Sequence, residues 1–364
     1  MTSDGVAHVP GVSGRGQDLP RLTSLRAFAA LAVFLFHLAR HIEWAPLRLT
    51  FAEGYVGVAF FYVLSGFVLT WSTRPSLPAR EFYVRRFARV YPSHFVMLVV
   101  ALLLPRLVMP VTPEALIANV LLVQAWFPQW EIAFGINSVS WSLSVEFFFY
   151  LCAPFLIRLG DRWPMRRLIV AFGGWFVLMS AVAVAMGLAG NATSVYAYTN
   201  PLIRSGEFVL GCLAAVAVKG GLVPRIPVTL GVGAVALTWL LTTGRWLPQS
   251  IADVVYVPAF LLLVLAAATT DLAGRPGLLT SRFLIYAGQV SFGFYLVHEL
   301  VLVNVAPFLA AGPSSKVAAS GVAGIILAVC FLLAMALHEG VEKPLQRVIR
   351  DRWGRGRVYP RINP

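Results

Sequence analysis

Residues 22–44 read LTSLRAFAALAVFLFHLARHIEW, and this stretch decides the fold class. It is mainly apolar and has the length that an α-helix needs to cross about 30 Å of hydrocarbon. Comparable runs recur along the 364-residue chain. They predict spans at 22–44, 54–72, 90–110, 138–158, 167–189, 202–218, 226–243, 251–270, 283–308 and 317–341. The connection 111–137 is polar and broken by prolines, and its apolar middle, residues 116–123, is expected to lie on the membrane or to dip into it.

The composition agrees with a membrane protein. Hydrophobic residues make up 59% of the chain, charged residues only 12%, and the mean hydropathy is +0.77. A soluble domain carries about 25% charged residues. We therefore predict an all-α, polytopic membrane helix bundle of about ten transmembrane helices. Cys152, Cys212 and Cys330 all lie inside apolar runs, without a CxxC or zinc pattern, so they are expected to pack in the core and no metal site is expected.

The formal net charge of +13 would suggest nucleic acid in a soluble protein. Here the basic residues lie between the apolar runs, as topological anchors do. Of the 29 Lys and Arg, 22 fall in the tails and the even-numbered connections and six on the opposite side. By the positive-inside rule both termini are cytoplasmic. The prediction is a multi-pass plasma-membrane protein whose partner is the lipid bilayer and not nucleic acid, with an N-terminal tail at 1–21, a membrane domain at 22–342 and a basic C-terminal tail at 343–364.

Arg26 and His37 lie within the first predicted span, where an ionisable side chain costs about 2.5–3.5 kcal/mol and needs a partner or a function. Eleven residues make three helical turns plus about 20°, so both side chains share one face, about 16 Å apart along the axis. Neutral imidazole can accept a hydroxyl proton near neutral pH, which suits His37 as a general base. The alternative is a hydrogen-bonded core histidine with an arginine that snorkels to the interface.

The segment EFYVRRFARVYPSHF, residues 81–95, brings three arginines to the cytoplasmic end of the third span. Arg85, Arg86 and Arg89 are expected to cluster on one helix face. Guanidinium groups suit forked binding of phosphate oxygens, and coenzyme A carries several phosphates, so the three form a candidate binding site. Plain anchoring at the interface is the alternative.

Two further segments place polar groups inside spans. In NSVSWSLSVEFFFY, residues 137–150, Ser142 and Glu146 stand at i and i+4, and Arg26 is the expected partner of Glu146. In GQVSFGFYLVHELVL, residues 288–302, Ser291, Tyr295 and His298 form one stripe, which could equally serve helix-to-helix hydrogen bonding.

Three smaller features carry structural expectations. Arg204 and Glu207 are expected to pair along one helix. Ser65-Gly66 is expected to let two helices approach closely. Glu342-Lys343-Pro344 is expected to end the last helix.

Together these segments resemble the membrane acyltransferase 3 family. The resemblance runs from LTSLRAFAALAVFLFH (22–37) through GYVGVAFFYVLSGFVLT (54–70), YVRRFARVYP and SVSWSLSVEFFFYL to VSFGFYLVHELV and EKPLQR. The family's functional Arg and His match Arg26 and His37, its arginine motif matches Arg86 and Arg89, and its late YLxH matches Tyr295 and His298. Its usual acidic residue before FFVLSG is Ala59 here, so any role of that acid is absent or taken elsewhere.

The resemblance implies an O-acyltransferase that uses acyl-CoA as co-substrate, with no permanently bound cofactor. The expected reaction transfers acetyl or another short acyl group to a hydroxyl of a carbohydrate or of a glycosylated or polyketide small molecule. His37 would act as the base, Arg26 and Glu146 would orient the site or stabilise charge, and Ser142, Tyr295 and His298 would support the substrate. The text VLSGFVLTWSTRP is most similar to the actinobacterial branch, some members of which acylate macrolide or ansamycin antibiotics.

Two alternatives remain open from the residues. A transporter or flippase could use the buried Arg, His and Glu side chains as a polar path. A non-catalytic membrane partner of a biosynthetic complex is the other. The signatures of serine hydrolases, Walker-type ATPases and zincins are absent from the sequence.

Overall fold

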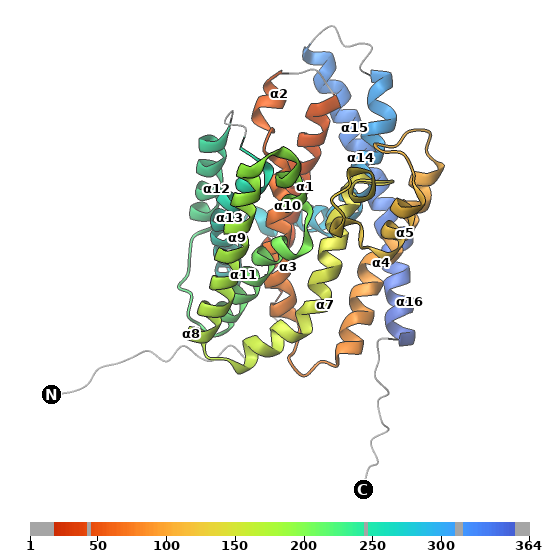
Figure 1. The fold of residues 1–364 in the computed structure, drawn as a ribbon. Coiled ribbons are helices and arrows are strands. Elements are labelled where there is room, and N and C mark those ends of the chain that lie inside the picture. The colour runs from red at the N-terminus through yellow and green to blue at the C-terminus, as the bar shows by residue number, and fades with distance from the viewer. Residues whose placement is uncertain (1–17, 42–44, 244–246, 310–315, 354–364) are drawn as a thin grey trace, which may run out of the picture.

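The computed structural model describes residues 18–41, 45–243, 247–309 and 316–353, and across these ranges it is helical and contains no strand (Figure 1). The helices are α1 (Pro20–His41), α2 (Ala45–Thr50), α3 (Gly57–Ser72), α4 (Ala79–Leu103), α5 (Pro113–Leu121), α6 (Trp130–Ala133), α7 (Trp141–Arg162), α8 (Met165–Leu168), α9 (Gly174–Ala189), α10 (Asn191–Thr199), α11 (Pro201–Lys219), α12 (Val228–Thr242), α13 (Gln249–Leu272), α14 (Arg282–Leu309), α15 (Lys316–Leu337) and α16 (Lys343–Trp353).

Each of the ten predicted spans corresponds to a helix in the described part of the chain. Eight helical segments of the described chain are long and apolar enough to cross a membrane, and α12 is a shorter apolar helix. The remaining prediction, 283–308, corresponds to the 28-residue α14, which packs mainly between α1 and α15. The all-α polytopic bundle is therefore confirmed.

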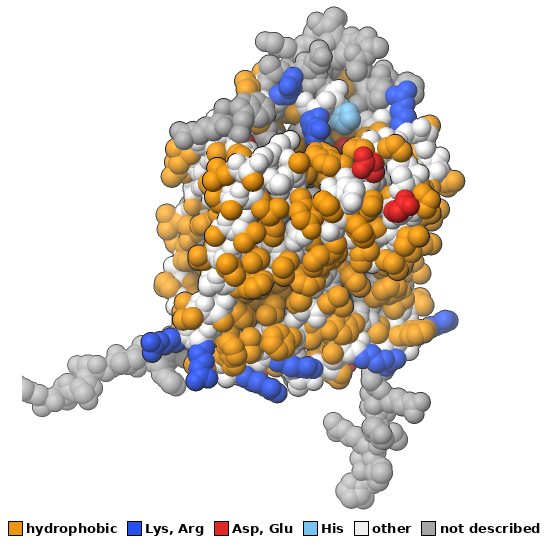
Figure 2. Space-filling model, viewed as in Figure 1, with side chains coloured by type: hydrophobic (Ala, Val, Ile, Leu, Met, Phe, Trp, Pro, Cys, Tyr) orange, Lys and Arg blue, Asp and Glu red, His pale blue; other side chains and the backbone are white. Residues whose placement is uncertain are grey.

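The surface is that of a membrane protein. In Figure 2 hydrophobic side chains cover the middle of the visible face, while Lys and Arg gather along its lower rim. The start of α1 and the end of α16 both lie at this lower end (Figure 1). We call it the basic end and the other the opposite end. The cytoplasmic location of the basic end stays a prediction.

Several predicted boundaries were wrong. The third span was expected at 90–110, but α4 runs from Ala79 to Leu103, because the arginine-rich segment is part of the helix. The last helix was expected to end at Glu342-Lys343-Pro344, but a π-helical turn at His338–Glu342 leads directly into α16. A proline ring clashes with the carbonyl four residues earlier in an α-helix, and the wider π turn next to Pro344 relieves that clash. The outer parts of the predicted tails, 1–17 and 354–364, lie outside the described residues.

The connection 111–137 is packed into the bundle by buried hydrogen bonds. Asn119 on α5 accepts from the Ser140 hydroxyl at 2.9 Å, and its carbonyl contacts the His94 ring at 2.9 Å. Gln124 donates to the Ser140 carbonyl at 2.9 Å. These bonds satisfy polar groups that burial would otherwise penalise, and they fix the segment that leads into α7.

Close packing of α3 against α11 confirms the role expected for Ser65-Gly66. A Cβ atom on Gly66 would collide with the backbone carbonyl of Phe208, and one on Gly211 would collide with that of Val63. The two glycines therefore let the helix backbones touch. Since α3 and α11 form one of the largest helix contacts of the fold, this packing holds the middle of the bundle.

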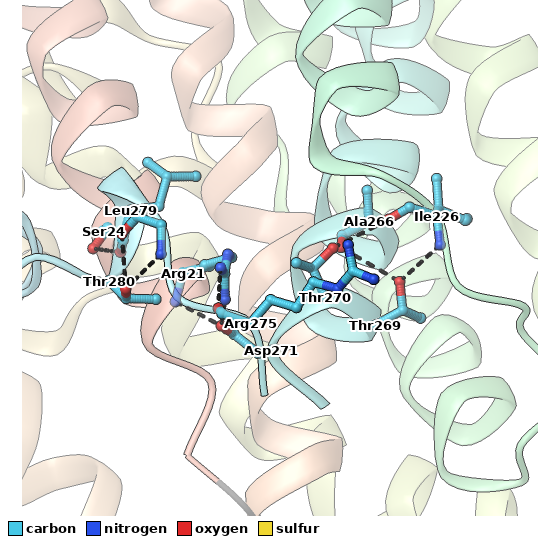
Figure 3. Close-up of polar contacts among 11 residues, drawn as sticks. Arg21, Ser24, Ile226, Ala266, Thr269, Thr270, Asp271, Arg275, Leu279 and Thr280 are labelled. Atoms are coloured by element: carbon cyan, nitrogen blue, oxygen red, sulfur yellow. Dashed lines mark hydrogen bonds and ion pairs between the residues drawn. The ribbon is translucent and has the colours of Figure 1, made fainter. Parts of the chain in front are cut away.

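Polar contacts at the basic end fix the start of α1 (Figure 3). Residue 21 was assigned to the N-terminal tail, but α1 already begins at Pro20. The Arg21 backbone N–H donates to Asp271 at 2.9 Å, and its guanidinium forms a buried ion pair with the same carboxylate at 2.5 Å. Ser24 donates to the Leu279 carbonyl at 2.7 Å. These contacts set the height of Arg26 and His37 relative to α14.

Candidate active site

A cavity of about 120 Å³ opens between α1, α3, α4, α7 and α14 toward the basic end. We call it the arginine cavity. Its lining includes three arginines and most of the polar side chains singled out in the sequence. The lining residues are Arg26, Val58, Phe61, Tyr62, Leu64, Ser65, Val68, Leu69, Arg86, Arg89, Val90, Ser142, Leu143, Glu146, Tyr150, Ser291, Phe292 and Tyr295.

Glu146 is the acidic group of this cavity. Its carboxylate accepts a hydrogen bond from the Tyr150 hydroxyl at 3.0 Å and interacts electrostatically with Arg26, Arg86 and Arg89. Among the described contacts Glu146 and Arg26 form no direct ion pair, although both line the cavity. The sequence analysis correctly expected Glu146 and Arg26 in one site. The expected one-to-one ion pair does not form, and the carboxylate instead interacts with three arginines. The cavity therefore carries a net positive charge.

The three arginines of α4 do not form one cluster. Arg86 and Arg89 face the arginine cavity, whereas Arg85 is exposed and pairs with Glu81 one turn away. Residues 85 and 86 point about 100° apart on a helix, which separates their side chains. Arg89 also forms an ion pair with Glu342, whose other oxygen lies 2.8 Å from His338 Nδ1. The π turn thus holds Arg89 at the cavity wall.

A second cavity, of about 840 Å³, opens at the opposite end. We call it the histidine chamber. It is lined by the upper part of α1 and by aromatic and polar residues from several connections. The lining residues are Val33, Phe36, His37, Arg40, His41, Ala52, Glu53, Tyr55, Val58, Val108, Met109, Trp130, Phe134, Ser138, Val139, Trp141, Gly187, Gly190, Asn191, Val195, Tyr198, Leu247, Pro248, Gln249, Tyr295, Glu299 and Val303.

His37 and His298 are in direct contact at the base of this chamber. His298 Nδ1 lies 2.8 Å from the Tyr295 carbonyl, so this nitrogen carries the proton and Nε2 is left as an acceptor. His298 Nε2 lies 3.1 Å from His37 Nδ1, which also lies 3.0 Å from the Val33 carbonyl. Both neighbours of His37 Nδ1 are acceptors, so Nδ1 is the donor. His37 Nε2 therefore has a free lone pair, the state a general base requires.

Glu299 lies beside the two histidines. His37, His298 and Glu299 offer ring nitrogens and a carboxylate oxygen that all lie within 4.8 Å of one another. Two histidines and a glutamate can bind zinc in proteins. In this arrangement, however, the ring nitrogens that face each other are joined by a hydrogen bond, which occupies the lone pair of His298. The geometry as it stands is that of a proton-transfer pair beside a carboxylate.

Tyr295 and Val58 line both cavities and form the wall between them. The Tyr295 hydroxyl donates to the Val139 carbonyl at 3.2 Å, and Ser142 donates to the same carbonyl at 3.0 Å. The predicted stripe on α14 is thus distributed over the site. Ser291 lies at the arginine cavity, Tyr295 at the wall and His298 behind His37.

Sequence reasoning missed several charged groups. Glu299 stood inside a quoted segment, directly after His298, and its burial in a span was the signal that could have identified it. Glu342 was interpreted only as part of a helix end. Asp253, in the predicted span 251–270, forms a buried ion pair with Arg204, which also lies 3.2 Å from Glu207 as expected. Glu53 precedes a span, and nothing in its sequence context signalled its burial.

Comparison with known proteins assigns the family. The family described as an acyltransferase domain, acyltransferase 3, matches residues 19–337. The chain belongs to the acyltransferase 3 family. Acyltransferase MdmB of Streptomyces mycarofaciens is 36% identical over 92% of this chain and 93% of its own length. No solved structure matches the chain.

Longer relatives are also similar. The putative peptidoglycan O-acetyltransferase YrhL of Bacillus subtilis is 27% identical over 90% of this chain and 55% of its own length. The peptidoglycan O-acetyltransferase OatA of Listeria monocytogenes is 27% identical over 54% of this chain and 33% of its own length. The chain is therefore a multi-pass membrane member of an acyl-transferring family, and it spans only part of these O-acetyltransferases.

Proposed function

We propose that this acyltransferase 3 protein is an acyl-CoA-dependent O-acyltransferase of the plasma membrane, with the donor in the arginine cavity and the acceptor hydroxyl in the histidine chamber. The observation that carries the proposal is the pair of cavities facing opposite ends of the bundle. One holds arginines suited to phosphates, the other a histidine with a free lone pair, and they share the wall formed by Tyr295 and Val58.

The donor side follows from charge and geometry. Arg86 and Arg89 stand where the phosphates of coenzyme A would arrive from the basic end, and guanidinium groups bind such oxygens in a forked manner. Arg26 lies deeper in the same cavity, about 16 Å along α1 from His37. At that distance it serves the donor and does not contact a carbonyl beside His37. The role in charge stabilisation expected of Arg26 therefore becomes donor binding.

The acceptor side is built for a hydroxyl compound larger than water. The histidine chamber combines aromatic walls, including Trp130, Phe134 and Trp141, with polar groups beside His37. Its volume lies in the range of pockets that bury small organic ligands. A carbohydrate or a glycosylated or polyketide small molecule fits this lining, because aromatic rings pack on its apolar faces and polar side chains bind its hydroxyls.

In the proposed reaction, the acyl end of the donor passes Tyr295 and Val58 to reach His37. His37 Nε2 then accepts the proton of the acceptor hydroxyl as the hydroxyl oxygen forms a bond to the thioester carbonyl carbon. The carbon–sulfur bond then breaks, and the coenzyme A thiolate takes the proton back from the imidazolium. An ester and free coenzyme A result, so atoms and charge balance. A covalent acyl-His37 or acyl-Tyr295 relay would divide the same transfer into two steps.

The test is a mass-spectrometric profile of metabolites and glycans from a strain lacking the gene, complemented with wild type, His37→Ala, Arg86→Ala or Arg85→Ala. An acyl mass restored by wild type and not by His37→Ala is expected, because a general base contributes about 10²–10⁴-fold in rate. Arg86→Ala should reduce the product, whereas Arg85→Ala, an exposed neighbour outside the cavity, should not.

A transporter would give a different result. The acyl profile would be unchanged in the deletion strain, while an intact product changed its location. Full product formation by His37→Ala would show that His37 is not the general base and would contradict the proposed mechanism.

A further inference from the structure

Protonation of His37 in the proposed function creates a charge problem inside the bundle. His37 is partly buried and its neighbour His298 is fully buried. An imidazolium between these groups would lose its hydration, at a cost of several kcal/mol per ion in proteins. His298 can share the proton through the 3.1 Å contact, but it is neutral and supplies no compensating charge. A carboxylate within reach of both rings would supply this compensating charge.

Glu299 has the position of that carboxylate. It follows His298 on α14, and one of its oxygens lies within 4.8 Å of a ring nitrogen of each histidine. Its Oε1 lies 3.9 Å from His41 Nε2, one helical turn beyond His37 on α1. His298 and Glu299, which are adjacent on α14, therefore face His37 and His41, which lie one turn apart on α1. This places the carboxylate beside the histidine pair, with one oxygen facing His41.

The second oxygen of Glu299 is free. Glu299 is 7% exposed, and its Oε2 is buried without a hydrogen-bond partner. A buried carboxylate oxygen without a donor costs free energy and is uncommon in native structures. Such a group is expected where it serves a charge that appears only during function.

The other carboxylates of the two cavities do not meet this requirement. Glu146 lines the arginine cavity, on the far side of Tyr295, and interacts with three arginines. Glu53 lines the histidine chamber, and one of its oxygens is also buried without a partner, but the group of ring nitrogens and carboxylate around His37 does not include it, so position excludes it.

We infer that Glu299 is a positioning residue for the reaction: it acts through the His37–His298 pair and stabilises the imidazolium that forms when His37 takes the acceptor proton. The inference rests on the proposed function. It assigns the reaction a three-residue unit, in which His298 fixes the tautomer of His37 and Glu299 supplies the opposite charge. This is the division of tasks found when a histidine base is oriented by a third group.

The experiment compares Glu299→Gln, Glu299→Asp, His37→Ala and Glu114→Gln in permeabilised cells of the deletion strain, which contain the natural acceptor. Radiolabelled acetyl-CoA is the donor probe, and labelled product is measured as a function of donor concentration. Glu114→Gln is the matched control, because it makes the same chemical change on an exposed residue that lines neither cavity.

Glu299→Gln should lower kcat about 10- to 100-fold, which is less than the loss of the base itself because His37 is still present, while the KM for acetyl-CoA stays within about twofold. Glu299→Asp should recover part of kcat, and Glu114→Gln should behave as wild type. A Glu299→Gln enzyme with wild-type kcat beside an inactive His37→Ala would overturn the inference and leave the proposed function intact. An active His37→Ala would instead overturn the proposed function.

Two further results would also overturn it. Equal loss of kcat and of thermal stability in Glu299→Gln and Glu299→Asp would show a structural role. Loss of wild-type activity on chelation, restored by zinc, would show that Glu299 and the histidines hold a metal ion instead of a proton.

Discussion

Removing Arg204 should destabilise the bundle more than removing either of its acidic partners. Arg204 is 2% exposed and lies between Asp253, with which it forms a close ion pair, and Glu207 at 3.2 Å. Its guanidinium also packs over the rings of Tyr62 and Tyr198, at 5.0 and 5.1 Å from their centroids. One cation thus faces two carboxylates from α11 and α13, and it connects these helices to α3 and α10.

The expected loss of folding free energy depends on which buried charges each substitution leaves without a partner. Arg204→Gln leaves two buried carboxylates without a cation, and breaking a buried pair in this way costs about 3–5 kcal/mol. Asp253→Asn keeps one carboxylate for the guanidinium but loses the closer contact, which should cost about 1–3 kcal/mol. Glu207→Gln leaves a neutral Arg204–Asp253 pair. The 3.2 Å contact is not aligned as a hydrogen bond, and removing the buried Glu207 charge also removes its desolvation penalty, so the cost should stay below about 1 kcal/mol.

The protein contains its own reporter for the assay. Cys212 and Cys330 are buried and unpaired, so a thiol-reactive fluorophore will label them as the bundle unfolds on heating. The unfolding midpoints should fall in the order wild type, Glu207→Gln, Asp253→Asn, Arg204→Gln. A Glu207→Gln variant as unstable as Arg204→Gln would refute the reasoning, because the two carboxylates would then be equivalent partners.

Three further predictions use the same assay. Gly66→Ala should cost about 1–3 kcal/mol, because its Cβ meets the backbone of α11, whereas Gly233→Ala, with open space around it, should be neutral. Arg21→Ala should cost about 3–5 kcal/mol, because it leaves Asp271 buried without its cation; a cost below about 1 kcal/mol would contradict this. Burial raises the pKa of Glu53, so the folded state loses stability as the pH rises through the carboxyl's titration range. Glu53→Gln should therefore raise the midpoint at pH 8 and lose that gain under acidic conditions; an equal gain at both pH values would contradict this.

Hydrophobic runs predicted the positions of the long apolar helices, because every span must satisfy its backbone hydrogen bonds within itself. Helix ends were harder, since they depend on amphipathic continuation and on local geometry. At α4 hydropathy set the start of the span at residue 90, although the arginines before it were expected on a helix face, and the helix begins earlier still, at Ala79. At Pro344 the helix continues through a π turn that no sequence pattern indicates.

Periodicity within one helix was informative about the candidate site. The eleven-residue spacing placed Arg26 and His37 on one face of α1, and both line cavities of the bundle. The spacing of Ser291, Tyr295 and His298 likewise placed them on one face of α14. Periodicity did not separate Arg85 from Arg86 and Arg89, because that depends on which side of α4 the bundle packs against.

The sequence by itself determined that this is a polytopic helical membrane protein of the acyltransferase 3 family, with ionisable residues at fixed heights along individual helices. Length, hydropathy and helical period are local properties, so they can be read from the chain alone. Only the tertiary structure decided which of those residues meet. The contact of His37 with His298, the carboxylate of Glu299 beside both and the link from Glu342 to Arg89 join helices far apart in sequence, and the packing of helix faces brings them together.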